Sequence, residues 1–194
     1  ETLSEDNGFK YRYRYSFMAR LILAQNPTQD YYTAIKNEIL SYKKVKSRIS
    51  WNHEKFNAGR IKCVMINVRG KSLYVYLPLN PDEYDKERYH FKDVRESKTG
   101  ETYPMLMKVK SNRAVKYAIE LIAEVMRKYG IEKLANSEVN DYHYKYATPE
   151  QLAGRKPPLV ILLDGKPEIE SEVATSEETL SEDNGFKYRY RYSF

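Results

Sequence analysis

The chain begins and ends with the same stretch of sequence. Residues 1–17 are ETLSEDNGFKYRYRYSF, and residues 178–194 repeat these letters at all seventeen positions. The two copies are 177 residues apart, so the chain holds one full period and the opening of the next. Chance does not produce such a match, and self-similarity at a fixed period is typical of repeat proteins. The sequence is therefore either cut from a tandem array or carries a duplicated terminal segment, of natural or engineered origin.

The repeated stretch has the pattern of a β-strand. Aromatic residues alternate with basic or polar residues from position 9 onward, which is typical of a half-buried strand. In the first copy apolar residues continue through 18–24, so we predict one long strand over residues 9–24. The aromatic face, which we expect to pair with other strands, consists of Phe9, Tyr11, Tyr13, Tyr15 and Phe17, repeated as Phe186, Tyr188, Tyr190, Tyr192 and Phe194.

The second copy stops at Phe194 and lacks the apolar continuation of the first. One interpretation is an arbitrary cut that leaves a disordered tail. The other is strand addition, in which the half-strand pairs with a sheet edge of its own chain or of a neighbouring chain. A row of large aromatic side chains is unfavourable in water. We therefore expect residues 186–194 to form a strand in a place equivalent to, or directly beside, residues 9–17.

The net charge of +6 is unevenly distributed. Residues 1–7 and 166–177 each carry −3 and residues 178–194 carry none, so the body between residues 8 and 165 carries +12. A basic body favours polyanion binding, whereas solubility, with acidic linkers offsetting the body, is the alternative. The candidate polyanion-binding residues are Arg12, Arg14, Lys43, Lys44, Lys46, Arg48, Arg60 and Lys62, and a wider set adds Lys10, Arg20 and Arg69.

The pattern of the body predicts an α+β fold, a mainly antiparallel sheet with two principal helices. Apolar residues at helical spacing predict helices over 28–46, capped by Thr28, and over 112–129, capped by Ser111. The buried stripe of the second helix is expected to be Val115, Ile119, Ile122 and Met126. Strands are predicted around 49–53, 61–69, 72–79, 89–94, 105–109, 142–146 and 159–163, with a short helix that begins after Thr148.

These elements divide the chain into four parts. Residues 1–8 are the end of an acidic linker, and residues 9–165 form the α/β repeat domain. Residues 166–185 are acidic and without periodic pattern, as in a linker. Residues 186–194 then form the first strand of the next repeat.

No pattern in the sequence predicts catalysis. The three histidines lie on separate segments without ligand spacing, and the single Cys63 excludes an internal disulfide and a Cys-rich zinc site. Cys63 stands among apolar residues of a predicted strand, so we expect it to be buried. We expect no enzyme, no cofactor and no small-molecule substrate. No run approaches the ~20 apolar residues of a membrane span, so no membrane partner is expected, and a cytoplasmic location is favoured over secretion.

Several successive segments resemble an uncharacterised domain of large, often repetitive proteins of clostridial-type bacteria. The segments are YRYSFMARLI, IKNEILSYKKVKSRISW, FNAGR, INVRGKSLYVYLPLNPDEY and YHFKDV, and the similarity covers residues 11–165. More distantly, the order of elements is similar to that of MmcQ/YjbR-type double-wing α/β domains. The resemblance implies a small α/β fold and, for the wider group, DNA binding. It implies no catalytic residues.

Two functions from different classes follow. In the first, which we expect, the domain is a non-enzymatic structural module whose partners are neighbouring copies, joined through strand addition by the duplicated segment. In the alternative, it is a nucleic-acid-binding module with a basic, Tyr-rich face whose tyrosines stack on bases. The repeat favours the first function, and the +12 body favours the second.

Overall fold

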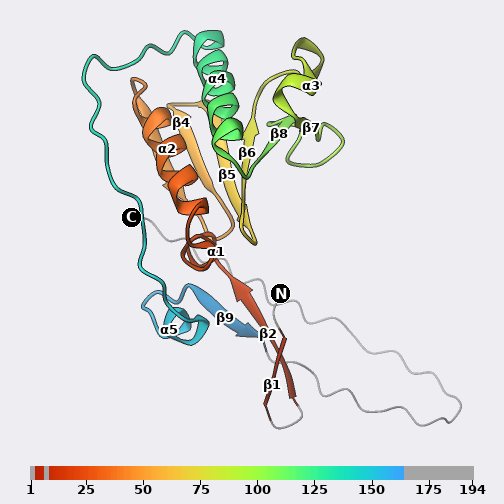
Figure 1. Cartoon of the computed structure of the whole chain (residues 1–194), viewed down its shortest axis with the longest axis vertical. Helices are drawn as coiled ribbons and strands as arrows, with labels where there is room; N and C mark the ends of the chain where they lie inside the picture. Colours follow the sequence, from red (N-terminus) through yellow and green to blue (C-terminus); the bar gives the residue numbers. More distant parts are fainter. Residues whose placement is uncertain (1–2, 7–8, 164–194) are drawn as a thin grey trace, which may run out of the picture.

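The computed structural model describes residues 3–6 and 9–163, with side chains from residue 13 onward. This part of the chain forms two antiparallel sheets and five α-helices (Figure 1). The elements are β1 Leu3–Asp6, β2 Phe9–Tyr15, α1 Phe17–Ala24, α2 Thr28–Leu40, β3 Val45–Ile49, β4 Glu54–Ala58, β5 Ile61–Arg69, β6 Ser72–Leu77, a 3-10 helix η1 Pro81–Glu83, α3 Lys86–Tyr89, β7 Phe91–Asp93, β8 Met105–Val109, α4 Asn112–Lys128, α5 Pro149–Ala153 and β9 Val160–Leu163. The expected α+β class with a mainly antiparallel sheet is confirmed.

The large sheet has six strands in the order β3-β4-β5-β6-β8-β7. Helices α1, α2 and α4 pack on one face of it, and Figure 1 shows α2 and α4 side by side across the strands. Side chains from this face and from the helices form the main core, in which Ile35, Ile66, Val75 and Leu121 have no exposed surface. Strand β5 lies near the middle of the sheet, as its apolar composition predicts.

Helix α4 has the predicted ends but a shifted buried face. Ser111 Oγ accepts a hydrogen bond from the Ala114 amide, and Gly130 has φ of +64°, so the helix stops in a left-handed turn. The buried residues include Ala118, Leu121 and Val125, which the predicted stripe omitted, while Ile119 is only partly buried. The stripe was wrong at Ile119 because the face that meets the sheet is centred between Ala118 and Ile122.

The predicted helix over 28–46 is too long. Helix α2 ends at Leu40, and the chain turns through Lys44, which has φ of +62°. Residues 45–49 then form strand β3, because this segment pairs with β4. Thr28 is not the cap. Its hydroxyl instead donates to the Lys71 carbonyl at 2.9 Å.

The predicted strand over 9–24 is wrong beyond Tyr15. Ser16 Oγ accepts a hydrogen bond from the Ala19 amide at 3.1 Å and thereby caps α1. The apolar residues that follow then recur at helical spacing, and Phe17 and Leu21 are fully buried in the main core. Phe17 therefore does not belong to the aromatic face of the strand. Tyr13 and Tyr15 do lie on β2, and both are half-buried.

The small sheet joins the two ends of the described chain. Its order is β1-β2-β9, with β2 antiparallel to both neighbours and β9 reached 145 residues later, at Val160 opposite Tyr15. Helix α5 packs on β9, and its capping box pairs Thr148 with Gln151, as the predicted helix start requires. A second core of Ala19, Ile22, Ala147, Leu152 and Val160 lies beneath this sheet. The predicted strand over 186–194 and the linker over 166–185 lie outside the described residues.

A buried polar cluster ties α2 to strands β3 and β4. Glu54 is fully buried, and one carboxylate oxygen lies 2.8 Å from Lys36 Nζ. The hydroxyl of Tyr32 donates to the other oxygen at 2.6 Å, and Ser47 Oγ donates to the first. Burial, and then the charge of Glu54, raises the pKa of Tyr32, so the phenol stays protonated and remains a donor. The carboxylate thus has partners that offset its desolvation.

The two isoleucines of α4 give a matched test of its packing. We expect Ile122→Ala to lower the free energy of unfolding by about 2–4 kcal/mol, because it leaves a cavity in a fully buried site. Ile119→Ala should cost roughly 1 kcal/mol, because only part of its side chain is removed from water. Urea denaturation of both variants measures the difference. Equal losses would show that the helix is rotated from the orientation described.

Candidate nucleic-acid interface

The large sheet has a second face that no helix covers. Directly opposite residues on neighbouring strands share a face, so the pairing register assigns each side chain to one side. One row crosses all six strands on the uncovered side and consists of Arg48, Lys55, Met65, Tyr76, Leu106 and Lys92. The residues between them along each strand, such as Phe56 and Val75, point to the main core. We call this uncovered side the open face.

The open face is basic around a central cluster in which Tyr103 packs on Met65 and Tyr76. The register places seven cationic residues on it, and they are Lys46, Arg48, Lys55, Lys62, Arg69, Lys92 and Lys108. Among the six strands, no Asp or Glu shares the open face with them, since Glu54 points to the core and Asp93 lies on the same side as Phe91. Arg48 lies directly opposite Lys55, a like-charge pair that destabilises a sheet.

These cations have no ionic partners among the described residues. By contrast, several basic residues around the helices and loops are paired, namely Lys43 with Glu132, Arg88 with Glu120, Arg95 with Asp82 and Asp93, and Lys133 with Glu38. Cations that no nearby carboxylate neutralises create a positive potential over the surface that carries them. The open face can therefore attract a polyanion.

One tyrosine ring lies among these cations. Tyr74 on β6 is half-buried, and the Arg69 guanidinium carbon and Lys108 Nζ lie 5.4 and 5.5 Å from its ring centroid. The next tyrosine on this strand, Tyr76, is buried under Tyr103, which packs on it and on Met65. Tyr74 packs beside this cluster and stays half-buried, so it is a ring of the open face whose exposed part can contact a planar group.

The structure divides the predicted polyanion-binding residues. It brings Lys46, Arg48 and Lys62 together on the open face, with Arg69 from the wider set, and Arg60 lies in the turn between β4 and β5. It does not bring the others there. Lys43 and Lys44 follow α2, Arg14 is exposed on the small sheet, and Arg20 donates to the Asn52 carbonyl at 2.6 Å. Lys10 and Arg12 lie on β2, and their side chains are outside the described part.

Sequence reasoning missed four residues of the open face: Lys55, Tyr74, Lys92 and Lys108. Each occupies an outward position of a strand, between residues that point to the core. The available signal was the alternation itself. Collecting the outward residues of the predicted strands would have found Tyr74, Lys92 and Lys108 but not Lys55, whose strand β4 was not predicted. Runs of consecutive basic residues pointed instead to the end of α2.

The expected strand-pairing residues lie in the small sheet or outside the described part. Tyr13 and Tyr15 pack against the second core, with ring centroids 6.2 Å apart. Strand β2 pairs with β1 through residues 9–12 and with β9 through residues 12–15. The first copy of the repeated segment therefore functions as a sheet strand with neighbours on both edges. The aromatic residues of the second copy, from Phe186 to Phe194, are not described.

Residues 131–148 form an extended strap that runs beside α2 to α5 (Figure 1). The predicted strand over 142–146 is wrong, because side chains of α2 rather than another strand satisfy the backbone. Asn37 bonds both the amide and the carbonyl of Asn140, and Gln29 Oε1 accepts from the Tyr144 amide at 2.7 Å. The strap is thus a fixed part of the helical face.

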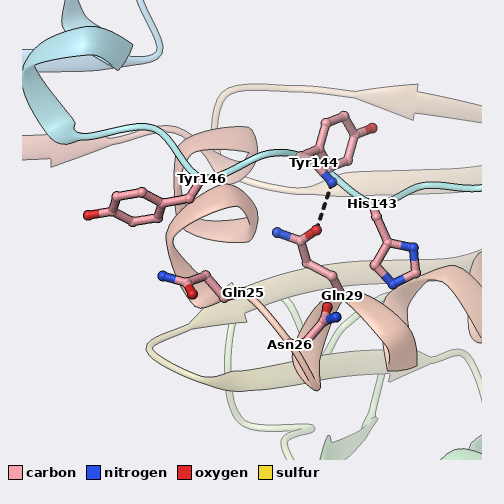
Figure 2. Close-up of a pocket in the computed structure, with 6 residues that line it drawn as sticks. All are labelled: Gln25, Asn26, Gln29, His143, Tyr144 and Tyr146. Carbon is pink, nitrogen blue, oxygen red and sulfur yellow. Dashed lines mark hydrogen bonds between the residues drawn. The ribbon is translucent and has the colours of Figure 1, made fainter.

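The strap and the α1–α2 turn enclose a hollow of about 240 Å³ (Figure 2). It is lined by Gln25, Asn26, Gln29, His143, Tyr144 and Tyr146. Gln29 Nε2 donates to the Leu21 carbonyl at 3.1 Å, and Gln29 Oε1 accepts the hydrogen bond from the Tyr144 amide of the strap. His143 Nε2 lies 2.7 Å from Asp30 Oδ1, and Nδ1 bonds Asp141. The polar groups of Gln29 and His143 are therefore used in hydrogen bonds that attach the strap to α2.

Other site chemistry is limited within the described residues. No group of three or more His, Cys, Asp and Glu side chains in them could hold a metal ion. Cys63 is buried as predicted, and burial raises the pKa of its thiol. Among the described helices, none combines the length and apolarity that a membrane span requires.

Comparison with known proteins found no matching family model, curated protein or solved structure. The resemblance to the clostridial-type domain and to double-wing domains therefore stays a prediction. The case for a function rests on the open face and on the repeat.

The His143 fastening predicts a pH dependence of the strap. Hydrogen bonds that the His143 ring donates to the carboxylates of Asp141 and Asp30 raise the pKa of His143 above its ordinary value. A folded-state pKa above the unfolded value stabilises the fold at low pH, and this contribution is lost as the pH rises through the folded-state pKa. The melting temperature of the unsubstituted protein should therefore exceed that of His143→Gln by more at about pH 5.5 than at about pH 8.5.

The neighbouring Lys145→Gln is the control, because Lys145 is also exposed on the strap but takes no part in the contacts of His143 with Asp30 and Asp141. A His143→Gln difference that is the same at both pH values would contradict the assigned fastening.

Proposed function

We propose that the protein binds single-stranded nucleic acid on the open face of the large sheet, without catalysing a reaction. The observation that carries the proposal is the set of seven cations with no carboxylate on the same face of the strands. Solubility requires a polar face but not a face of one sign, and mixed charges would avoid the repulsion between Arg48 and Lys55. A polyanionic ligand explains the single sign.

The dimensions of the face suit a short stretch of single strand. Neighbouring strands lie about 4.8 Å apart, so six strands span about 24 Å. Cations lie on both sides of Tyr74, with Lys55 and Arg69 toward β4 and β5 and Lys108 and Lys92 toward β8 and β7. Phosphates can then contact the flanking cations while one base stacks on the ring.

A single strand fits this face better than a duplex. Reading a duplex requires a helix or a ribbon that enters a groove, whereas the open face presents the side of a sheet, with Tyr103 packed on its middle strands. The bases of a single strand are free to turn toward an aromatic ring, as in other sheet platforms that bind RNA. Base stacking tolerates any sequence, so we propose binding with weak sequence preference.

Charge-removing and ring-removing variants test the proposal by fluorescence anisotropy with a labelled single-stranded oligonucleotide. Lys55→Ala, Arg69→Ala and Lys108→Ala should each weaken binding and lower the slope of log K against log[salt] by about 0.7. Tyr74→Ala should cost about 1–3 kcal/mol of binding free energy with little change in that slope. The matched control is Lys116→Ala, which removes an exposed cation from α4 on the covered side.

Two outcomes would contradict the proposal. The first is no binding at low salt. The second is a loss in Lys116→Ala as large as that in the open-face variants, because binding would then follow total charge rather than the face.

A second candidate function is that of a structural module joined to neighbouring copies through strand addition by the duplicated segment. The observation in its favour is the place of β2, the first copy, between β1 and β9 in the small sheet. The repeated segment therefore joins the opening of one period to its close. A further copy offers the same strand to a neighbouring module.

Deletion of residues 178–194 tests the second candidate. If the second copy adds to a sheet, the truncated chain should lose thermal stability or change its oligomeric state, as measured by calorimetry and analytical ultracentrifugation. If both stay unchanged, the duplicated segment has no part in assembly. Nucleic-acid binding is measured on the same truncated chain, and we expect it to persist because the open face is intact.

A further inference from the structure

We propose that β9 accepts the second copy of the repeated segment in exchange for the first, with residues 186–192 taking the place and register of β2. The inference rests on the strand-addition function and specifies its acceptor. The occupant is a named segment of this chain, from the same molecule or from a second one. Four features of the described residues and of the sequence carry it.

The first feature is a hydrophobic seat separate from the main core. The second core consists of residues from α1 at the opening of the period and from α5 and β9 at its close, with Ala19, Ile22, Leu152 and Val160 buried. Tyr13 and Tyr15 of β2 pack against it. The strand that pairs with β9 thus packs on the second core. Replacing this strand by another copy does not require the large sheet to open.

The second feature is the register. In the structure Arg12, Tyr13, Arg14 and Tyr15 lie opposite Leu163, Leu162, Ile161 and Val160. The second copy presents the same four residues in the same order at Arg189, Tyr190, Arg191 and Tyr192. Every backbone and side-chain contact between these residues and β9 is therefore available to either copy.

The third feature is the length of chain to be closed. Leu163 and Arg12 are 151 positions apart, whereas Leu163 and Arg189 are only 26 apart. Closing the shorter loop costs less conformational entropy. The 22 residues between Leu163 and Phe186 span about 25 Å as a flexible chain, which is enough to return antiparallel to β9.

The fourth feature is the different anchoring of the two copies. The first continues through Ser16 into α1, where Phe17 is fully buried, whereas the second follows β9 after 22 residues. The first copy is therefore held from its C-terminal end, and the second is connected to β9 through the residues before it. The two copies therefore compete for the same position beside β9, where each can make the same contacts, but they are connected to the rest of the chain differently.

This competition gives a rule for assembly. A molecule of any number of periods that ends in the repeated segment has one more copy of the strand than it has β9 acceptors. The opening strand of each period can close its own period or the preceding one, and the spare copy can occupy β9 of another molecule. Periods linked in this way form a chain without any new interface.

Cross-strand disulfide trapping in the full chain tests the exchange. In a Cys63→Ala background, Ile161→Cys is combined with Arg191→Cys, the position identical to Arg14, which lies opposite Ile161. Ile161 and Arg14 are both exposed, so neither substitution opens a core. Ile161→Cys with Arg14→Cys traps the described arrangement. Ile161→Cys with Lys187→Cys is the register control, because the proposed strand would place Lys187 on the same side as Arg191 but four residues away, too far from Ile161 for a disulfide.

We expect disulfides in the Arg191→Cys and Arg14→Cys chains and none in the Lys187→Cys chain, on non-reducing gels and by mass spectrometry of the linked peptides. Adding Tyr13→Pro and Arg14→Pro to the Arg191→Cys chain should raise the yield of its disulfide. The two prolines remove adjacent backbone N–H groups, one of which faces β9, and so weaken the pairing of the first copy. A monomeric or a dimeric disulfide supports the proposal equally.

Two results would overturn the exchange. One is a disulfide in the Arg14→Cys chain but none in the Arg191→Cys chain. The other is a yield that does not rise when the first copy is weakened, because the second copy would then pair at another edge. In either case a change on deletion of residues 178–194 would still support strand addition, so the exchange can fail while that function stands.

Discussion

The large sheet has two faces, and the three helices that pack on it, α1, α2 and α4, all cover the same one. Every strand from β3 to β8 therefore has one side toward the helices and one side that no helix covers. The covered side contains fully buried residues such as Ile66, Val75 and Met105. On the open side Tyr103 packs on Met65 and Tyr76, and the charged residues of the strands around this cluster all carry the same sign. The candidate function follows from this division of the sheet.

The buried cluster around Glu54 lies on the covered side and holds in place the strands that carry part of the open face. Glu54 and Ser47 point inward from β4 and β3 and meet Lys36 and Tyr32 of α2. The residues next to them along the strands point outward, and these include Lys55, Lys46 and Arg48. Because the inward groups are bonded to the helix, the edge of the sheet that presents three of the seven cations is fixed in position. The ring of Tyr142, which lies 4.4 Å from Lys36 Nζ, extends the same cluster to the strap.

The sequence predicted correctly those elements whose residues show the pattern of a single type of secondary structure. Strands β5 and β8 and the ends of α4 followed from alternation, a serine cap and a glycine stop, each a property of a few adjacent residues. The errors arose where two local patterns competed. The apolar pattern of residues 17–24 is compatible with both a strand and a helix. Ser16 favours the helix, because its Oγ caps the first turn by accepting a hydrogen bond from the Ala19 amide. Residues 142–146 alternate like a strand, but Asn37 and Gln29 of α2 hold that region of the strap.

The site was predicted less well than the fold. Lys46 and Lys108 share one face only because β3 and β8 belong to the same sheet, and strand order and register are not visible in either segment alone. The basic run after α2 attracted attention instead, although Lys43 is paired with Glu132. Net charge suggested a polyanionic ligand, whereas the place proposed for it required the pairing of distant strands.

The most direct measurement is a map of amide chemical shifts of the isotope-labelled chain during titration with a single-stranded oligonucleotide. The account predicts that the largest changes occur along β4, β5, β6 and β8, around Lys55, Arg69, Tyr74 and Lys108. Residues of α2 and α4 on the covered side should change little. Changes centred on those helices, or on the small sheet, would contradict the assignment of the open face as the binding surface.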